Sequence, residues 1–241
     1  MKILAVESTS MVAGTALIQE DKLIGEIRVN HLKTHSEQLL PMIDQLLKNC
    51  ACSLDEIDVL AVSVGPGSFT GIRIGVATLK GLALALNKPV IGVSSLQALA
   101  WQVPHFTGWI IPLVDAQKNM VYTAAYYFDG PQAITALPPD VLHIQEWIET
   151  LLQKEEPLLF LGDAAAKHRV RLEDSFRERA QFADPVHAMP SAAAVGQCAM
   201  VQALKGEFQQ ADDLHPVYLR TSQAEKTYLQ QQLQKKAGAD G

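Results

Sequence analysis

One stretch of the chain, residues 59–100, constrains the fold more than any other, because only Arg73, Lys80 and Lys88 in it are charged. Its apolar start at 59–64 predicts a buried strand that enters a glycine-rich turn at 65–68. The small residues after the turn predict a helix over 70–86, followed by a short strand. Such a strand–turn–helix unit either holds an anion at the helix N-terminus or lets another helix pack closely.

The flanking residues predict a repeated order of elements. Thr34 and Glu37 have the spacing of a capping box and predict a helix, in which Pro41 predicts a bend or a restart. Asp129-Gly130 predicts a hairpin turn, and Ser191 predicts a helix N-cap. Strands are predicted at 2–6, 12–19, 23–30, 59–64, 89–93, 109–114, 119–128, 133–137 and 158–161, and helices at 34–47, 70–86, 94–102, 144–152 and 191–204.

This order predicts a duplicated α/β protein of two lobes, each a mixed sheet with the order βββαβαβα, complete in the first lobe and weakened in the second. We expect the first lobe, with its candidate dimerisation helices, over residues 1–103. The second is expected over 104–220, with a final helix that either stays there or returns to the first lobe. Residues 221–241 form a polar tail.

Composition excludes several classes of protein. The 48% hydrophobic content is sufficient for a core, and the net charge of −6 argues against a stand-alone nucleic-acid binder. We find neither a signal peptide nor an uninterrupted apolar run of about 18 residues, so we expect a cytoplasmic protein without a membrane segment. The three cysteines form no metal-binding or disulfide pattern, and His31 and His35 lie on either side of a helix start, so no metal site is expected.

Five segments together resemble the TsaB, or YeaZ, family. They are KILAVESTS at 2–10, HSEQLLP at 35–41, GPGSFTGIRIG at 65–75, VDA at 114–116 and PVYLR at 216–220. The resemblance covers residues 1 to about 130, returns at 216–220, and is most specific in its longest segment. It implies a two-lobed ASKHA fold, the actin-like ATPase and ribonuclease H-like class, within the glycoprotease-like superfamily.

The resemblance also implies a function in tRNA modification. It implies a non-catalytic dimerisation and scaffold subunit of the complex that transfers a threonylcarbamoyl group to N6 of adenosine 37, in tRNAs reading codons that start with A. The implied partners are a TsaD-type catalytic subunit and a TsaE-type ATPase, with a homodimer when the chain is alone and tRNA bound only through the complex. ATP and Mg²⁺ would be used by the complex and not bound tightly by this chain.

Two residues argue against catalysis by the chain itself. Ser95 and Leu99 stand where the resemblance places metal-binding histidines in the catalytic relative, and neither residue type is an effective metal ligand. We therefore expect an accessory subunit and no catalytic residues. The alternatives are a stand-alone ASKHA ATPase or kinase and, less favoured, a metallopeptidase-like protein.

The two first-lobe helices carry the candidate interface. Both are apolar around most of their circumference, which predicts burial on two sides, either against sheet and partner or wholly within the monomer. If a partner covers them, Ile43→Asp or Val76→Glu should weaken pairing and leave the monomer folded. The candidate interface residues are Leu39, Leu40, Ile43, Leu46, Leu47, Ile72, Val76, Leu79 and Lys80.

A nucleotide site between the lobes is the other candidate. Glycines allow a phosphate to approach the backbone, and an acid after the first strand of each lobe could hold Mg²⁺. Alternatively, the glycines form only a tight turn and the acids cap local N–H groups. The family usually has Asp where this chain has Glu7. The candidate cofactor-binding residues are Glu7, Ser8, Thr9, Gly65, Gly67, Ser68 and Asp115.

Overall fold

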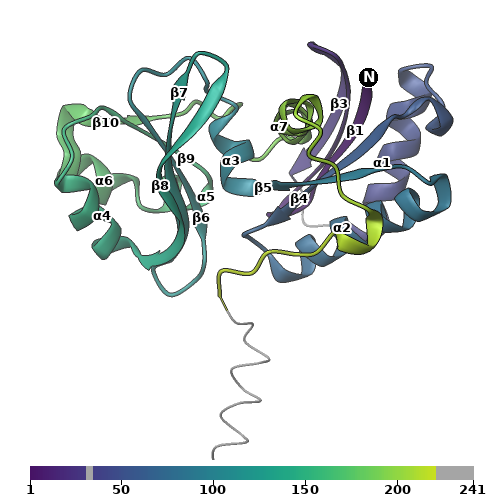
Figure 1. Ribbon diagram of the computed structural model, residues 1–241. Coiled ribbons are helices and arrows are strands. Elements are labelled where there is room, and N and C mark those ends of the chain that lie inside the picture. The colour runs from purple at the N-terminus through teal and green to yellow at the C-terminus, as the bar shows by residue number, and fades with distance from the viewer. Residues whose placement is uncertain (31–34, 221–241) are drawn as a thin grey trace, which may run out of the picture.

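The computed structural model describes residues 1–30 and 35–220 and shows two lobes, each built on a five-stranded mixed sheet (Figure 1). The strand order is β3-β2-β1-β4-β5 in the first sheet and β10-β9-β6-β7-β8 in the second. The expected two-lobed α/β architecture is confirmed. Thr34, His31 and the polar tail lie outside the described residues.

In the first lobe, the two strands that flank the central strand run in opposite directions to each other. β1 is antiparallel to β2 and parallel to β4, as a meander followed by a crossover helix requires. The elements of this lobe are β1 (Lys2–Glu7), β2 (Val12–Gln19), β3 (Lys22–Asn30), α1 (His35–Asn49), η1 (Leu54–Glu56), β4 (Val59–Gly65), α2 (Phe69–Leu86), β5 (Val90–Ser94) and α3 (Ser95–Ala100).

The second lobe repeats the arrangement with shorter helices. Its central strand β6 is antiparallel to β7 and parallel to β9. The elements are β6 (Trp109–Asp115), β7 (Met120–Asp129), β8 (Gln132–His143), α4 (Ile144–Leu152), β9 (Leu158–Leu161), α5 (Asp163–Lys167), α6 (Arg169–Phe176), η2 (Arg177–Arg179) and β10 (Ala180–Phe182), followed by α7 (Ala192–Leu204) and η3 (Ala211–Asp213).

Several of these elements differ from the sequence expectation. β8 extends past the predicted 133–137 and includes the exposed Pro138 and Pro139. It is an edge strand whose register shifts near these prolines, so their missing N–H groups interrupt no regular series of hydrogen bonds to β7. The short elements α5, α6 and β10 were not predicted, since 5, 8 and 3 residues carry too little periodicity. α1 continues through the exposed Pro41 without a restart.

Two helices connect the lobes. α7 follows the second sheet in sequence but packs on β1, β2 and β5 of the first, so the final helix returns to the first lobe (Figure 1). A side chain on Gly196 would collide with Ile18, so glycine there lets α7 lie close to the sheet. α3 packs in turn on β6 and β7 of the second sheet.

α2 lies against the turn that follows β1. The Ser8 hydroxyl donates to the Gly71 carbonyl at 2.9 Å, and a Cβ on Gly75 would overlap the Ser8 oxygen. By length and composition α2 could cross a membrane, a test that core helices of soluble proteins also pass. The two sides of α2 differ. Gly75 allows close packing on the side that faces Ser8, whereas a Cβ on Gly81 would meet nothing within 4 Å.

These two glycines of one helix should respond oppositely to alanine. Gly75→Ala is expected to lower the free energy of unfolding by about 1–3 kcal/mol, because the new methyl group overpacks the contact with Ser8. Gly81→Ala is expected to raise it by up to about 1 kcal/mol, the helix-propensity difference. Urea unfolding followed by circular dichroism measures both, and equal effects of the two changes would contradict the packing described for α2.

Candidate functional site

The candidate acid of the first lobe is used by its own turn. Glu7 and Ser8 are fully buried, and Thr9 is 2% exposed. One carboxylate oxygen of Glu7 accepts hydrogen bonds from both the backbone N–H and the hydroxyl of Thr9, each at 2.6 Å. The geometry is that of a local cap, and it leaves these three side chains almost no surface that a ligand could reach.

The glycine-rich turn packs against the same residues. The Ser68 N–H donates to the Thr9 carbonyl at 2.7 Å, and a Cβ on Gly67 would overlap that carbonyl. The Ser68 hydroxyl accepts from the Gly71 N–H at 3.2 Å and caps α2. An anion cradle needs backbone N–H groups that point at the ligand. Here the N–H groups of Ser68 and Gly71 donate to partners within the protein.

The positions assigned to lost metal ligands have packing roles. The Ser95 hydroxyl donates to the carbonyl of Pro66, which fixes α3 to the glycine-rich turn. Leu99 is 1% exposed in a hydrophobic cluster with β6 and β7. Within residues 1–30 and 35–220, no group of three or more His, Cys, Asp or Glu side chains is placed to hold a metal ion.

In the second lobe, two acids lie at the ends of adjacent parallel strands. Asp115 ends β6 and accepts from the Lys167 ammonium at 2.9 Å and from the Gln117 N–H at 3.1 Å. Asp163 follows β9 and accepts from the backbone N–H groups of Asp115 and Ala164. Burial raises the pKa of Asp163. The carboxyl ends of parallel strands are where α/β sheets bind ligands, but the charge of Asp115 is already balanced by Lys167.

Sequence reasoning missed Asp163, although it carried a signal. Gly162-Asp163 directly follows the buried strand β9, as Asp115 ends β6. Next to this pair, His168 is 7% exposed and its Nε2 has no partner in the described part of the chain. Burial lowers the pKa of His168, and the nearby charges of Lys167 and Arg171 lower it further. The neutral imidazole is therefore the form that the folded lobe accommodates.

The structure corrects most of the candidate interface. Seven of the nine residues are at most 7% exposed and belong to the first-lobe core, because α1 and α2 turn them toward the sheet and toward each other. The expectation that Ile43→Asp or Val76→Glu leaves the monomer folded is wrong, since either would bury a charge. The seven are Leu39, Ile43, Leu46, Leu47, Ile72, Val76 and Leu79.

Only two of the nine reach the surface. Leu40 is 52% exposed, and the Lys80 side chain is 27% exposed, with its ammonium group donating to the Asp212 carbonyl at 3.0 Å. The outer face of α2, which the candidate set did not include, is apolar and exposed. Ala77, Gly81, Leu84 and Ala85 form this face, with Leu84 58% exposed, and we refer to it as the candidate α2 docking face. Within the described protein, 33% of the residues of α2 are buried.

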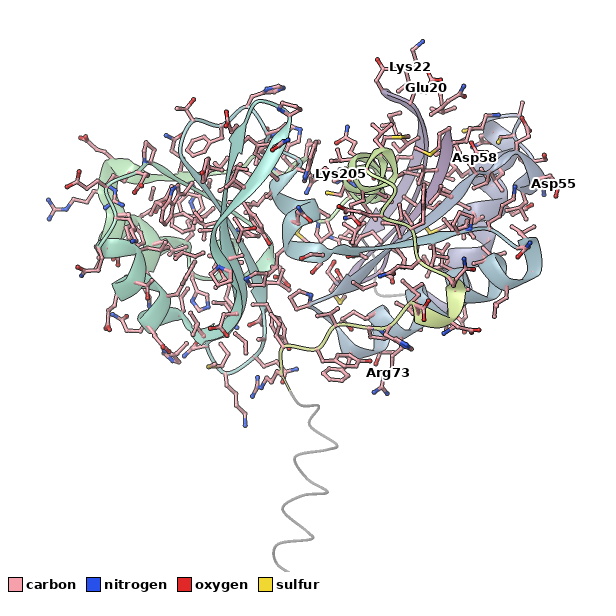
Figure 2. The ribbon with its side chains drawn as sticks, in the orientation of Figure 1. Glu20, Lys22, Asp55, Asp58, Arg73 and Lys205 are labelled. Atoms are coloured by element: carbon pink, nitrogen blue, oxygen red, sulfur yellow. The ribbon has the colours of Figure 1, made fainter. Side chains whose placement is uncertain are left out.

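A groove adjoins this region. It has a volume of about 610 Å³ and lies between α1, η1 and α2, with Leu40, Leu47, Leu54 and Leu82 among its lining residues. Figure 1 shows α1 on the side of the first lobe that faces away from the second. Arg73 lies at the other end of α2 and points away from the protein (Figure 2).

Comparison with known proteins gives consistent matches. Residues 29–228 match the family model described as TsaD, tRNA N6-adenosine threonylcarbamoyltransferase. The chain is 33% identical over 235 residues to the tRNA threonylcarbamoyladenosine biosynthesis protein TsaB of Bacillus subtilis, covering 96% of this chain and 100% of the relative. The TsaB protein of Haemophilus influenzae is 27% identical, with 91% and 94% covered. The structure of YeaZ from Pseudomonas aeruginosa matches with a TM-score of 0.76 at 25% identity, covering 90% of this chain and 99% of that one.

The buried imidazole predicts a pH dependence of stability. Because the pKa of His168 is lower in the folded protein than in the unfolded chain, the unfolded chain binds the extra proton first as the pH falls. The contribution of neutral His168 to the free energy of unfolding is thus complete above about pH 6.5 and is lost as the pH falls below it. Comparing Tm at pH 7.5 and pH 5.5, we expect a smaller decrease for His168→Phe than for the unchanged protein, and an identical decrease would refute this assignment.

Proposed function

The chain belongs to the TsaB (YeaZ) family, and we propose that it is a non-catalytic scaffold subunit in tRNA threonylcarbamoyladenosine biosynthesis. In this role it pairs with a TsaD-type catalytic subunit, in the complex that transfers a threonylcarbamoyl group to N6 of adenosine 37. The TsaE-type ATPase joins that pair and uses ATP and Mg²⁺.

The observation that carries the proposal is the exposed apolar face of α2. α2 has a mean hydropathy of 1.4 and only 33% of its residues are buried, so part of its apolar side-chain surface faces water. Leu84 projects from this face at 58% exposure, while Ala77, Gly81 and Ala85 keep the surrounding surface flat. Small residues let a second helix approach closely, and a protruding leucine fits a partner's groove. Exposed apolar patches of this kind mark interaction sites.

A partner of the same fold suits this face. The chain itself matches the TsaD family model over most of its length, so a TsaD-type subunit should present equivalent helices. Two related faces can then pair around a pseudo-twofold axis, and two identical copies can pair in the same way. We therefore propose the α2 docking face, with Leu40 and the adjoining groove, for both the heterodimer and the homodimer that forms when the chain is alone.

Absence of turnover is supported by the cleft residues. Glu7 and Thr9 are buried and bonded to each other, and buried Ser8 donates to the α2 backbone. Asp115 is paired with Lys167, and Ser95 and Leu99 pack inside the protein. The net charge of −6 favours tRNA binding through the complex. A protein with these partners works in the cytoplasm.

The docking face is tested by one substitution with a matched control. Leu84→Arg places a charge in the proposed interface and should weaken both self-association and TsaD pairing about tenfold or more. Because Leu84 is exposed, Tm should change by no more than about 2 °C. Val170→Arg on α6, where Val170 is 72% exposed, is the control and should leave both associations intact.

Size-exclusion chromatography with light scattering measures self-association, and co-elution with a TsaD protein measures pairing. An unchanged dimer and an unchanged TsaD complex with Leu84→Arg would place the interface elsewhere.

The non-catalytic assignment has its own test. We expect the purified chain neither to hydrolyse ATP nor to gain thermal stability with millimolar Mg-ATP, since a ligand present below its Kd stabilises by less than about 0.4 kcal/mol. A clear rise in Tm with Mg-ATP, or ATP turnover by the purified chain, would instead favour the stand-alone ATPase or kinase.

A further inference from the structure

Residues 214–220 cross from the first lobe to the second outside both sheets. After η3 this segment runs beneath the molecule, past the start of α2 and toward the second lobe (Figure 1). Upstream of it, Gln209 exchanges two backbone hydrogen bonds with Val90 on the edge of the first sheet. We call residues 214–220 the strap.

The strap is anchored to the first lobe by three kinds of contact. Leu214 is 1% exposed within the first-lobe core. The Val217 N–H donates to the Val64 carbonyl at 2.8 Å, and the Val217 carbonyl lies where a Cβ on Gly65 would be. Position 65 therefore requires glycine, because a Cβ would collide with the Val217 carbonyl and because the backbone φ of 109° is unfavourable for other residues.

Tyr218 adds an aromatic anchor on α2. Its ring stacks on Phe69, with 4.2 Å between the centroids and 4° between the planes. Arg73 donates from Nε to the Tyr218 hydroxyl at 2.9 Å, and its guanidinium group lies 5.5 Å and 5.7 Å from the centroids of Phe69 and Tyr218. The first turn of α2 thus holds the strap from the solvent side, where Figure 2 places Arg73.

The next two residues belong to the other lobe. Leu219 packs on a cluster that consists mainly of second-lobe residues, among them Val114 and Tyr122, and that also includes residues of α3. We call it the second-lobe cluster. Arg220 donates from Nη1 to the Ala116 carbonyl at 2.6 Å. Ala116 immediately precedes three residues in the left-handed region, Gln117, Lys118 and Asn119, with φ of 64°, 52° and 58°. Such a run is unfavourable for L-residues, so its surroundings must hold it.

Adjacent residues are therefore attached to different lobes. Tyr218 is attached to α2 and Leu219 to the second-lobe cluster, and consecutive Cα atoms are only about 3.8 Å apart. The strap has no slack at this point, so the lobes cannot rotate apart there without breaking one anchor.

We propose that the strap locks the angle between the lobes and transmits changes at the first turn of α2 to the turn at residues 116–120. Arg73 adjoins the α2 docking face, so a docked partner would act on the second lobe by this route, a consequence that rests on the proposed function.

Hydrogen–deuterium exchange of the full chain tests the lock directly. Arg220→Ala removes a charge-assisted hydrogen bond and should speed exchange at 116–120 about tenfold or more. The Val217 amide in the strap should also exchange faster. Arg171→Ala, on the exposed surface of α6, is the matched control and should change neither region.

Transmission is tested from the opposite end. Arg73→Ala loosens Tyr218 on the first lobe and touches nothing in the 116–120 turn, yet that turn should exchange faster if the strap transmits the change. In the Arg73→Ala, Arg220→Ala double variant, the increase in exchange rate should be smaller than the product of the two single-variant increases, because both changes act on one segment. Unchanged exchange at 116–120 in Arg73→Ala would overturn the proposal, and since Arg73 is exposed this variant decides the question even if Arg220→Ala fails to fold.

The same comparison in a Leu84→Arg background separates the strap from the docking face. Faster exchange at 116–120 in that background supports the strap whether or not Leu84 lies in an interface. Loss of the effect there would show that self-association, and not the strap, connects the two regions, and would also overturn the proposal.

Discussion

The close contact between α2 and the turn after β1 is the constraint on which the rest of the structure depends. Ser8 donates to the Gly71 carbonyl, and it can lie this close to α2 because Gly75 has no side chain to collide with the Ser8 oxygen. This contact sets the distance of α2 from the sheet and turns its other side, with Leu84, toward water. The same small residues that make the helix fit the protein make its outer face flat enough for another helix.

The turn after β1 and the glycine-rich turn are also bonded to each other. The Thr9 carbonyl accepts from the Ser68 N–H, and Thr9 donates twice to one carboxylate oxygen of Glu7. Buried polar groups that are paired in this way favour a single rigid arrangement. Glu7, Ser8 and Thr9 therefore contribute to the packing of the first lobe, which is consistent with the non-catalytic role proposed above.

The two lobes are duplicates in order but not independent in packing. α7 covers the first sheet and α3 contacts the second, so each sheet is completed by a helix from elsewhere in the chain. The strap then returns from α2 to Ala116. In the scaffold role proposed above, such cross-connections would hold the second lobe in register with the first when a partner binds one of them.

The sequence by itself determined most of the longer regular elements. It placed β2, α4 and β9 at their observed bounds, and Ser191 accepts from the Ala194 N–H at the predicted cap of α7. Tertiary structure alone decided which side of α2 meets the sheet. A helix that is apolar on all sides has no sequence signal for its inner face, so Val76 and Leu79 could not be told from Leu84 until the contact with Ser8 fixed the rotation of the helix. For Glu7 the sequence left a ligand site and a local cap as alternatives, because an acid after a strand has the same sequence pattern in both cases, and the structure shows the bonds to Thr9.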